Sequence, residues 1–415
     1  MHPYDDGYSP APRRRPRRSQ PAEGRVNMAY VRHVTPGHAE LGQALVTGGV
    51  LSADWAGAFA DVPRAAFLPE LMWPWDMAAG RSVPVSRTDD PERWQAYADA
   101  DCPVVTQWDD GRHAGTEPGA VATSSASMPS VVFRMLRDLD VRGGDRVLEI
   151  GTATGWNAAL LAHRAGRVST VEVDADLAER ARVSLEKFGS SARVVRGDGF
   201  DGYPEGAPYD RIIGTCGLRR FPWAWVEQCR PGGILVAPWG AHFSNADAVA
   251  RLVVADDGRS ASGRFTGPVE FMKLRAQRLP GVVHGEYVRG SVAEGWESST
   301  GITEAEFLGE GFAPQRFVVG LRVRDCLQVE AEKRDGARPV WFYGLRDRSW
   351  ACVLFRDGAD ARVWQHGARR LWDEVEAAYR WWVARDRPGC ARFGLTVTAE
   401  GERVWLDGAG ESWVL

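Results

Sequence analysis

A glycine turn near the middle of the chain carries the residues best suited to chemistry. Residues 147–150 form a short apolar run, the turn spans Gly151 to Gly155, and residues 156–165 have the spacing of a helix. A strand followed directly by such a turn brings backbone N–H groups close to a ligand at a helix N-terminus. Glu172 lies near the end of the next apolar run, where a carboxylate can accept hydrogen bonds from both hydroxyls of a ribose. The first hypothesis is therefore a nucleoside site.

The elements that must position these residues alternate between strands and helices. Helices are predicted at 156–165, 175–188 and 222–229, and strands at 147–150, 167–173, 193–196, 209–214 and 234–238. This alternation predicts an α/β fold with a doubly wound, mainly parallel sheet. Ligands of such sheets bind at the carboxyl ends of the strands. The candidate ligand-binding residues at those ends are Glu149, Gly151, Thr152, Ala153, Thr154, Gly155, Glu172, Asp198, Gly199 and Thr215.

The spacing within the turn narrows the choice of ligand. It departs from the Gly-x-Gly-x-x-Gly pattern of dinucleotide sites, and no Gly-Lys-Ser/Thr of a P-loop follows. S-adenosylmethionine remains as the common ligand, with Glu172 on its ribose and Asp198 near its adenine. Thr152 and Thr154 either bond to its carboxylate or cap the helix. Glu149 either acts through water on its amine or braces the turn.

Composition sets outer limits on function. The 415 residues carry a net charge of −4, which gives no reason to expect a nucleic-acid or membrane partner. No apolar run approaches the ~20 residues that span a bilayer, and the arginine-containing N-terminus, which no apolar region follows, does not resemble a secretory signal. Six scattered cysteines and eight histidines form no metal-binding spacing. We expect a cytoplasmic protein of two or three domains without a metal site.

Short motifs spread over roughly residues 40–275 occur in the order known from one enzyme family. The chain resembles the protein-L-isoaspartate O-methyltransferases. The matching segments are residues 61–69, 127–129, 147–161, 171–174, 197–199, 207–213 and 231–233. The resemblance implies a Rossmann-like fold and S-adenosylmethionine as the methyl donor.

The resemblance also implies the reaction, which is esterification of the side-chain carboxylate of an aspartyl or isoaspartyl residue. This carboxylate has a reference pKa of about 3.9, so it is ionised at neutral pH and no strong base is needed. The following backbone nitrogen can then attack the ester to give a succinimide. The family's active-site serine corresponds to Ser127, although Ser124 or Ser125 could take that role. Ser124, Ser125, Met128 and Pro129 are the expected substrate contacts.

Two residues depart from the family pattern. Ala153 stands where the family usually has glycine in the turn, and Met128 stands where it often has glutamine. We expect the turn to tolerate Ala153, because an alanine needs only an ordinary φ. Met128 leaves the details of substrate recognition open.

The resemblance divides the chain into parts. We expect a disordered tail at 1–25, a methyltransferase domain at 26–280, a linker at 281–310 and a C-terminal α+β domain at 311–415. Within the methyltransferase domain, an N-terminal helical substrate-binding part (38–140) precedes the Rossmann-like core (141–280).

Three hypotheses about function stay open. Segments 369–376 and 392–398 resemble extensions of actinobacterial relatives that accompany lanthipeptide or graspetide pathways, which implies a ribosomal precursor peptide as substrate and a peptide-recognition role for the C-terminal domain. The alternative is general repair of isoaspartyl proteins. A hypothesis of another class is a binding module that lost catalysis through Ala153 and Met128.

Overall fold

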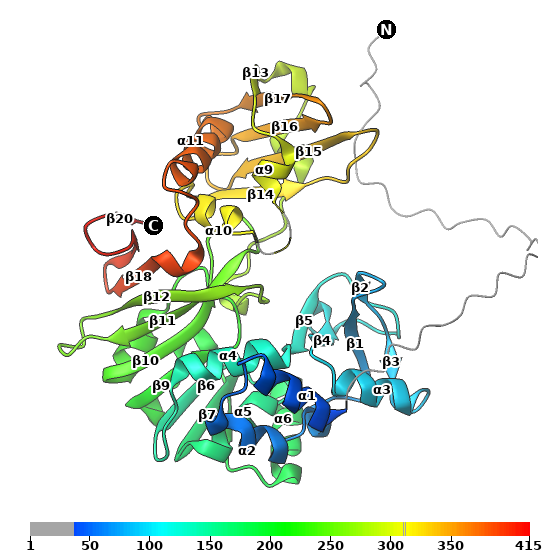
Figure 1. Cartoon of the computed structure of the whole chain (residues 1–415), viewed down its shortest axis with the longest axis vertical. Coiled ribbons are helices and arrows are strands. Elements are labelled where there is room, and N and C mark those ends of the chain that lie inside the picture. Colours follow the sequence, from blue (N-terminus) through cyan, green and yellow to red (C-terminus); the bar gives the residue numbers. More distant parts are fainter. Residues whose placement is uncertain (1–36, 310, 312) are drawn as a thin grey trace, which may run out of the picture.

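The computed structural model describes residues 37–309, 311 and 313–415. The tail expected at 1–25 lies outside these residues. Within them, the chain forms a 10-stranded sheet and two 5-stranded sheets (Figure 1). No helix in the described ranges is both long and apolar enough to cross a bilayer.

The central strands of the main sheet are parallel, as predicted. The sheet has the order β20-β19-β18-β12-β11-β10-β9-β6-β7-β8. Its parallel strands are β6 (Arg146–Ile150), β7 (Arg167–Glu172), β8 (Arg193–Arg196), β9 (Tyr209–Gly214) and β10 (Cys229–Trp239). Leu148 and Ile212 are fully buried, because parallel strands are covered on both faces. The predicted α/β doubly wound class is confirmed.

Helices cover the two faces of this sheet. One face packs against α4 (Pro129–Leu139), α5 (Trp156–Arg164) and α6 (Ala175–Phe188), with α1 (His38–Thr47) and α2 (Ala53–Asp61) outside them. The short helix α7 (Trp223–Gln228) packs on the opposite face through the fully buried Trp225. Apolar residues of α4 recur at helical spacing, which is why this helix buries one side against β9 and β10.

The N-terminal part differs from the expected helical segment. It contains a second sheet made of β1 (Leu71–Asp76), β2 (Arg81–Ser82), β3 (Val85–Ser86), β4 (Val104–Trp108) and β5 (Ala122–Ala126), together with α3 (Pro91–Ala98). These strands are short and include Pro74, so their sequence shows no regular alternation. They are stabilised by a hydrophobic cluster of their own around Met72, Trp94 and Val104.

The last three strands of the chain extend the main sheet. After the antiparallel hairpin β11 (Asp247–Val254) and β12 (Ser260–Val269), which the sequence did not predict, β18 (Phe393–Thr398) pairs with β12, and β19 (Gly401–Leu406) and β20 (Ser412–Val414) follow. The expected boundary at residue 311 therefore does not separate these strands from the core. The physical reason is that β12 would otherwise leave its edge unpaired.

Residues 296–383 form a separate antiparallel sheet with helices on one face. Its strands are β13 (Trp296–Thr300), β14 (Cys326–Glu330), β15 (Ala337–Gly344), β16 (Trp350–Arg356) and β17 (Ala359–His366), and its helices are α9 (Glu304–Leu308), α10 (Gln315–Gly320) and α11 (Leu371–Val383). The α+β class expected for the C-terminal part is confirmed. Residues 281–310 are not a plain linker, because they contribute α8 (His284–Tyr287), β13 and α9.

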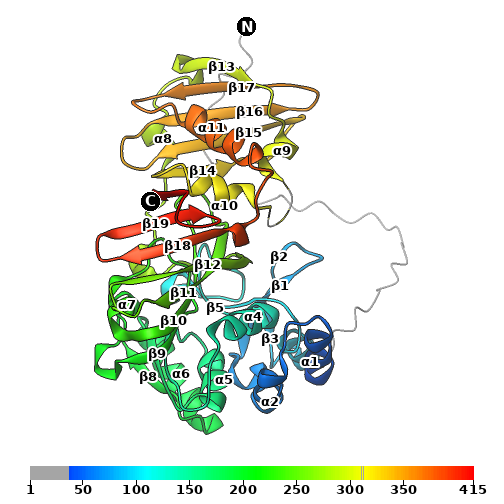
Figure 2. The same ribbon diagram turned by 60° about the vertical axis from the view of Figure 1, so that its left-hand side comes forward.

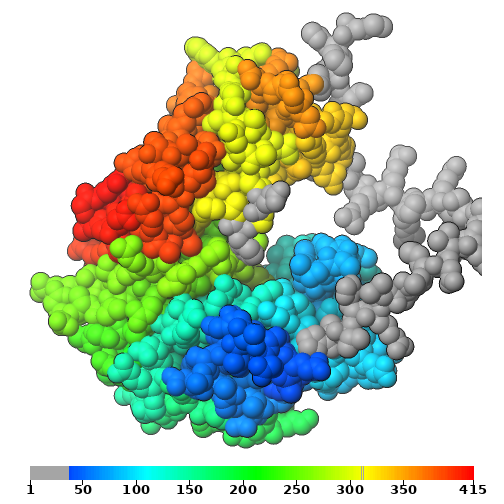
Figure 3. Space-filling view, viewed as in Figure 1, coloured from blue at the N-terminus to red at the C-terminus, as the bar shows by residue number. Residues whose placement is uncertain are grey.

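The main sheet and the C-terminal sheet (β13–β17) share one hydrophobic core. A single cluster of buried side chains runs from Leu148 in β6 through Trp239 and Phe317 to Phe342 and Trp372. Figure 2 shows the C-terminal sheet stacked on the last strands of the main sheet. On the face seen in Figure 3, the surface is hollowed between this C-terminal unit and the β1–β5 sheet.

Candidate active site

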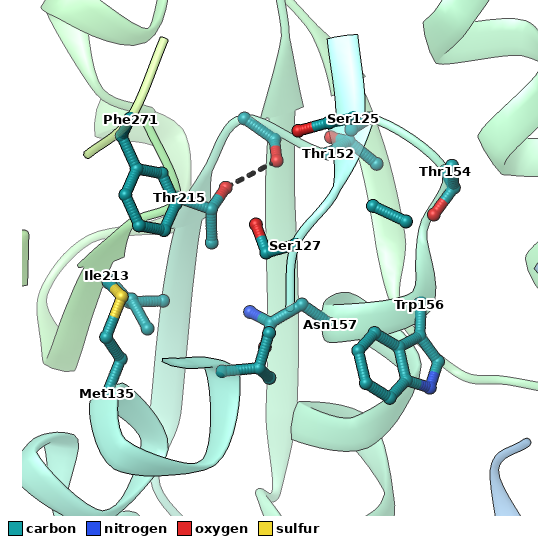
Figure 4. Close-up of a pocket in the computed structure, with 14 residues that line it drawn as sticks. Ser125, Ser127, Met135, Thr152, Thr154, Trp156, Asn157, Ile213, Thr215 and Phe271 are labelled. Carbon is teal, nitrogen blue, oxygen red and sulfur yellow. Dashed lines mark hydrogen bonds between the residues drawn. The ribbon is translucent and has the colours of Figure 1, made fainter. Parts of the chain in front are cut away.

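The glycine turn lines a recess together with members of residues 124–130, here named the serine loop, which run from the end of β5 into α4. Its volume is about 480 Å³, part of which is open to solvent. The lining residues are Ser125, Ala126, Ser127, Val132, Met135, Gly151, Thr152, Ala153, Thr154, Trp156, Asn157, Ile213, Thr215 and Phe271 (Figure 4). The structure thus brings together the two segments from which the sequence predicted the methyl donor and the substrate to be bound.

The backbone of the turn adopts left-handed conformations at three positions. The φ angles are 100° at Gly151, 47° at Ala153 and 90° at Gly155. A Cβ on Gly151 would lie 2.8 Å from Oγ1 of Thr215, which donates a hydrogen bond to the Gly151 carbonyl at 2.6 Å. The expectation of an ordinary φ at Ala153 was wrong. A left-handed alanine costs about 1–2 kcal/mol, because its Cβ crowds the following carbonyl.

Glu172 is placed at the carboxyl end of β7 and faces the turn. Its Oε2 accepts a hydrogen bond from the N–H of Ala153 and its Oε1 accepts one from the N–H of Asp174, both at 3.0 Å. Burial raises the pKa of this carboxyl, while the two backbone donors act in the opposite direction. A carboxylate offers about four acceptor positions, so hydroxyl groups of a ligand can still bind to it.

Glu149 is fully buried behind the turn. It accepts hydrogen bonds from Nδ2 of Asn157 at 2.7 Å and from Oγ1 of Thr170 at 2.5 Å, and Thr170 in turn bonds to Thr152 at 2.7 Å. Burial raises the pKa of Glu149 to about 7. Of the two roles predicted for Glu149, this network favours the one in which its side chain braces the glycine turn. Asn157 was not predicted; its only signal was a polar residue in the first turn of an otherwise apolar helix.

Asp198 and Gly199 lie outside the recess, at the end of β8. The exposed Asp198 accepts a hydrogen bond from the N–H of Phe200 at 2.9 Å and so caps the short helix η3 (Gly199–Asp201). A Cβ on Gly199 would lie 2.2 Å from the Ile150 side chain, so the backbone approaches β6 as only glycine allows. Glu172 and Gly155 are also absent from the recess lining.

The residues of the serine loop differ in their surroundings. Ser125 and Ser127 line the recess, and Figure 4 places the Ser127 side chain between Thr215 and Asn157. Ser124 is buried and accepts a hydrogen bond from Thr106 at 3.1 Å. Met128 and Pro129 begin α4 and do not line the recess.

The sequence missed the apolar wall of the recess. The unpredicted lining side chains here are Val132, Met135, Ile213 and Phe271. They come from α4, β9 and the segment after β12, so only the fold brings them together. Trp156 is only 3 % exposed and also borders the recess.

These features define a class of protein. A parallel sheet with a glycine turn after one strand, a buried acid at the end of the next and an adjoining hydroxyl-lined recess is the arrangement of a Rossmann-like protein that binds a nucleoside-bearing ligand. The sequence model of the protein-L-isoaspartate(D-aspartate) O-methyltransferase family matches residues 91–278.

Individual relatives agree with this match. A protein-L-isoaspartate O-methyltransferase from Ignicoccus hospitalis is 35% identical over 204 residues, which cover 48% of this chain and 80% of the relative. Protein-L-isoaspartate O-methyltransferase 2 from an Anaeromyxobacter species is 34% identical over 186 residues, 45% of this chain and 70% of the relative. The chain belongs to the protein-L-isoaspartate O-methyltransferase family and is an S-adenosylmethionine-dependent methyltransferase.

One solved structure extends the likeness in fold. A structure of a protein-L-isoaspartate O-methyltransferase, 22% identical, matches 89% of this chain and 100% of its own with a TM-score of 0.50. Because the match covers 89% of the chain, it extends beyond the family segment 91–278 and includes much of the C-terminal unit. A putative family member from Plasmodium falciparum, solved in complex with S-adenosyl-L-homocysteine, is 14% identical and has a TM-score of 0.43.

Proposed function

We propose that this enzyme esterifies the side-chain carboxylate of an isoaspartyl or aspartyl residue in a peptide or protein, with the carboxylate held at Ser127. The observation that carries the proposal is that Ser127 and the turn residues Gly151–Thr154 line the same recess. When bound, S-adenosylmethionine supplies an electrophilic methyl group on a sulfonium. An oxygen–carbon bond forms as the carbon–sulfur bond breaks, S-adenosylhomocysteine leaves and no proton is transferred.

The donor set fits this methyl donor. The left-handed glycine turn exposes backbone groups to the recess, and Glu172 offers a carboxylate at the end of the neighbouring strand. We assign Thr152, Ala153 and Thr154 to the methionine half and Glu172 to the ribose. Asp198 and Gly199, beyond the recess at the end of β8, are assigned to the adenine side.

The recess suits a reaction in which charges disappear. A carboxylate and a sulfonium give two neutral products, so a wall of low polarity favours the products and the transition state over the separated ions. Val132, Met135 and Phe271 supply such a wall. The Ser127 hydroxyl can donate a hydrogen bond that orients the carboxylate, and orientation contributes up to about 7–11 kcal/mol. No side chain has to act as a general base.

For the physiological substrate we propose a dedicated ribosomal peptide, a lanthipeptide or graspetide precursor. The support is the resemblance of segments 369–376 and 392–398. These segments form the start of α11 and strand β18, where Trp372 and Leu395 are buried in the shared core. They therefore act as scaffold, and the peptide would contact other surfaces of the C-terminal unit.

General isoaspartyl repair is the second candidate. One observation favours it: the fold over 89% of this chain is shared with a structure named as a protein-L-isoaspartate O-methyltransferase. The C-terminal unit is thus compatible with repair as well as with biosynthesis.

Methyl transfer from labelled S-adenosylmethionine tests both the proposed carboxyl methylation and the choice of substrate. A short isoaspartyl peptide is compared with its aspartyl counterpart and with precursor peptides encoded beside the gene. Fast turnover of the isoaspartyl peptide alone supports repair, and strong preference for a precursor supports maturation. Intact donor binding without a base-labile methyl ester on any of these peptides would contradict carboxyl methylation, and absence of donor binding would support the non-catalytic module.

A further inference from the structure

Arg64 is a buried arginine whose five N–H groups all bind backbone carbonyls. It belongs to the short helix η1 (Arg64–Phe67) and is 2 % exposed. Nε donates to Ala98 at 3.0 Å, Nη1 to Cys102 at 2.9 Å and to Ser127 at 3.2 Å, and Nη2 to Tyr97 at 2.8 Å and to Ala100 at 2.7 Å. Every donor of the guanidinium is thereby used.

These bonds join the recess to the end of α3 and the segment that connects α3 to β4. Four acceptors lie in residues 97–102, and the fifth is the carbonyl of Ser127 itself. The guanidinium also lies 5.8 Å from the ring centroid of Trp156, which borders the recess. Arg64 therefore contacts two residues that line the recess, Ser127 through its carbonyl and Trp156 through its ring.

The same segment holds the serine loop at a second point. Oδ1 of Asp101 accepts a hydrogen bond from the N–H of Ser130 at 2.8 Å. Ser127 follows β5 directly, and Ser130 lies in the first turn of α4. The segment 127–130 is thus anchored at both ends, at Ser127 by Arg64 and at Ser130 by Asp101.

Burying this guanidinium is costly, so its retention calls for a reason. The desolvation penalty is several kcal/mol for a buried ion, and among the described residues no carboxylate forms an ion pair with Arg64. Burial lowers the pKa of Arg64, whereas the Cys102 thiol and the carboxyls of Asp101 and Asp99 act in the opposite direction. An apolar side chain of similar volume would leave the five carbonyls that Arg64 binds without this donor. One of these carbonyls is that of Ser127, which Arg64 therefore holds in place.

We propose that Arg64 is a positioning residue for Ser127, with Asp101 as a second anchor at Ser130 in the first turn of α4. By holding the Ser127 carbonyl, Arg64 fixes the backbone from which the hydroxyl reaches into the recess. The inference rests on the proposed role of Ser127 in orienting the substrate carboxylate.

The substitution Arg64→Lys tests this, with Arg211→Lys as the matched control. Arg211 is 3 % exposed and also donates to a backbone carbonyl, that of Asp140 at 2.9 Å. Unlike Arg64 it has carboxylate partners, Asp140 at 3.8 Å and Asp145 at 3.6 Å. It pairs with Val147 at the amino end of β6, whereas the recess lies at the carboxyl ends of the strands. We expect kcat to fall about tenfold or more in R64K and less than about threefold in R211K, with donor affinity unchanged in both. Equal losses of kcat in the two variants would overturn the proposal.

Asp101 provides a test that does not disturb a buried group, in case R64K does not fold. Asp101 is exposed, so its replacement leaves the core intact. Asp101→Ala removes the acceptor for the Ser130 N–H, and kcat should fall several-fold with KM for the donor unchanged. Asp101→Asn keeps an acceptor oxygen and should restore kcat. A D101A enzyme with the wild-type kcat would refute the two-anchor arrangement.

Hydrogen exchange separates this inference from the proposed function. In R64K, the amides of residues 127–132 should exchange at least about tenfold faster than in R211K, while those of residues 151–157 stay protected in both. If the wild-type enzyme esterifies no aspartyl or isoaspartyl peptide, the proposed function fails, yet exchange still reports on the loop. Equal exchange of residues 127–132 in R64K and R211K would overturn the positioning role.

Discussion

Oε2 of Glu172 accepts a hydrogen bond from the backbone N–H of Ala153 at 3.0 Å. The acid proposed to hold the ribose therefore also holds the strained residue of the glycine turn, whose φ is 47°. The donor site and the turn are thus coupled through one carboxylate, and a substitution at Glu172 or at Ala153 should affect the other residue.

Replacing Glu172 should weaken donor binding. Glu172→Ala removes a charged acceptor, and we expect a loss of roughly 1.5–3 kcal/mol in affinity for S-adenosylhomocysteine, as for hydrogen bonds to charged groups. Glu172→Gln keeps one acceptor oxygen and should lose less. Isothermal titration calorimetry measures both. Wild-type affinity in the alanine variant would show that the ribose is bound elsewhere.

Ala153→Gly should stabilise the fold. Glycine adopts a φ of 47° without the Cβ penalty, and this outweighs its greater freedom in the unfolded chain, so we expect a gain of up to about 1 kcal/mol. Ala162→Gly, in the interior of α5, is the matched control and should cost about 1 kcal/mol. Urea unfolding gives both values. A loss of similar size in both variants would mean that the turn imposes no strain on Ala153.

How much the sequence predicts depends on the kind of signal. The parallel strands and the glycine turn were predictable because their apolar runs and turn residues are local patterns. The β1–β5 sheet was not, since strands such as Val85–Ser86 are too short to show alternation and depend on a cluster around Trp94. The pairing of β18 with β12 joins residues far apart in sequence, and no local pattern reports it.

The same distinction holds for the site. Ser127 and Thr152 lie next to motifs and were predictable, and the structure places both in the recess. Phe271 and Met135 reach the recess only through packing. The left-handed φ of Ala153 was also hidden, because an alanine in the sequence argues for an ordinary backbone.

The pKa of Glu149 should make stability depend on pH. It is raised from 4.5 to about 7 by burial, so the native state holds its proton more tightly than the unfolded chain. Stability should therefore fall as the pH rises from about 4.5 to 7, by about 3 kcal/mol for this group, and level off above. Glu149→Gln should remove this share, matching the wild type near pH 5 and exceeding it at pH 8. An identical pH profile of the unfolding free energy in both proteins would contradict this.

Ser127→Ala should lower turnover without weakening donor binding. Loss of one hydrogen bond to a charged substrate group corresponds to about 1.5–3 kcal/mol, or roughly tenfold to a hundredfold in kcat/KM for the peptide. Ser125→Ala is the control from the same recess and should cost less than about threefold. Steady-state kinetics and calorimetry test the pair. A larger loss in S125A than in S127A would assign the role to Ser125.

The shared core should make the chain unfold as one unit. Leu395 of β18 is fully buried in the cluster that also contains residues of the main sheet and of the C-terminal unit, and its strand pairs with β12. We expect a single calorimetric transition, and Leu395→Ala should lower its free energy by about 2–5 kcal/mol, whereas Thr396→Ala on the same strand should change it by less than about 1 kcal/mol. A chain ending at residue 280 should lose solubility, because it exposes the edge of β12. Two resolved transitions, with only the weaker one shifted by L395A, would show that the C-terminal strands do not support the methyltransferase fold.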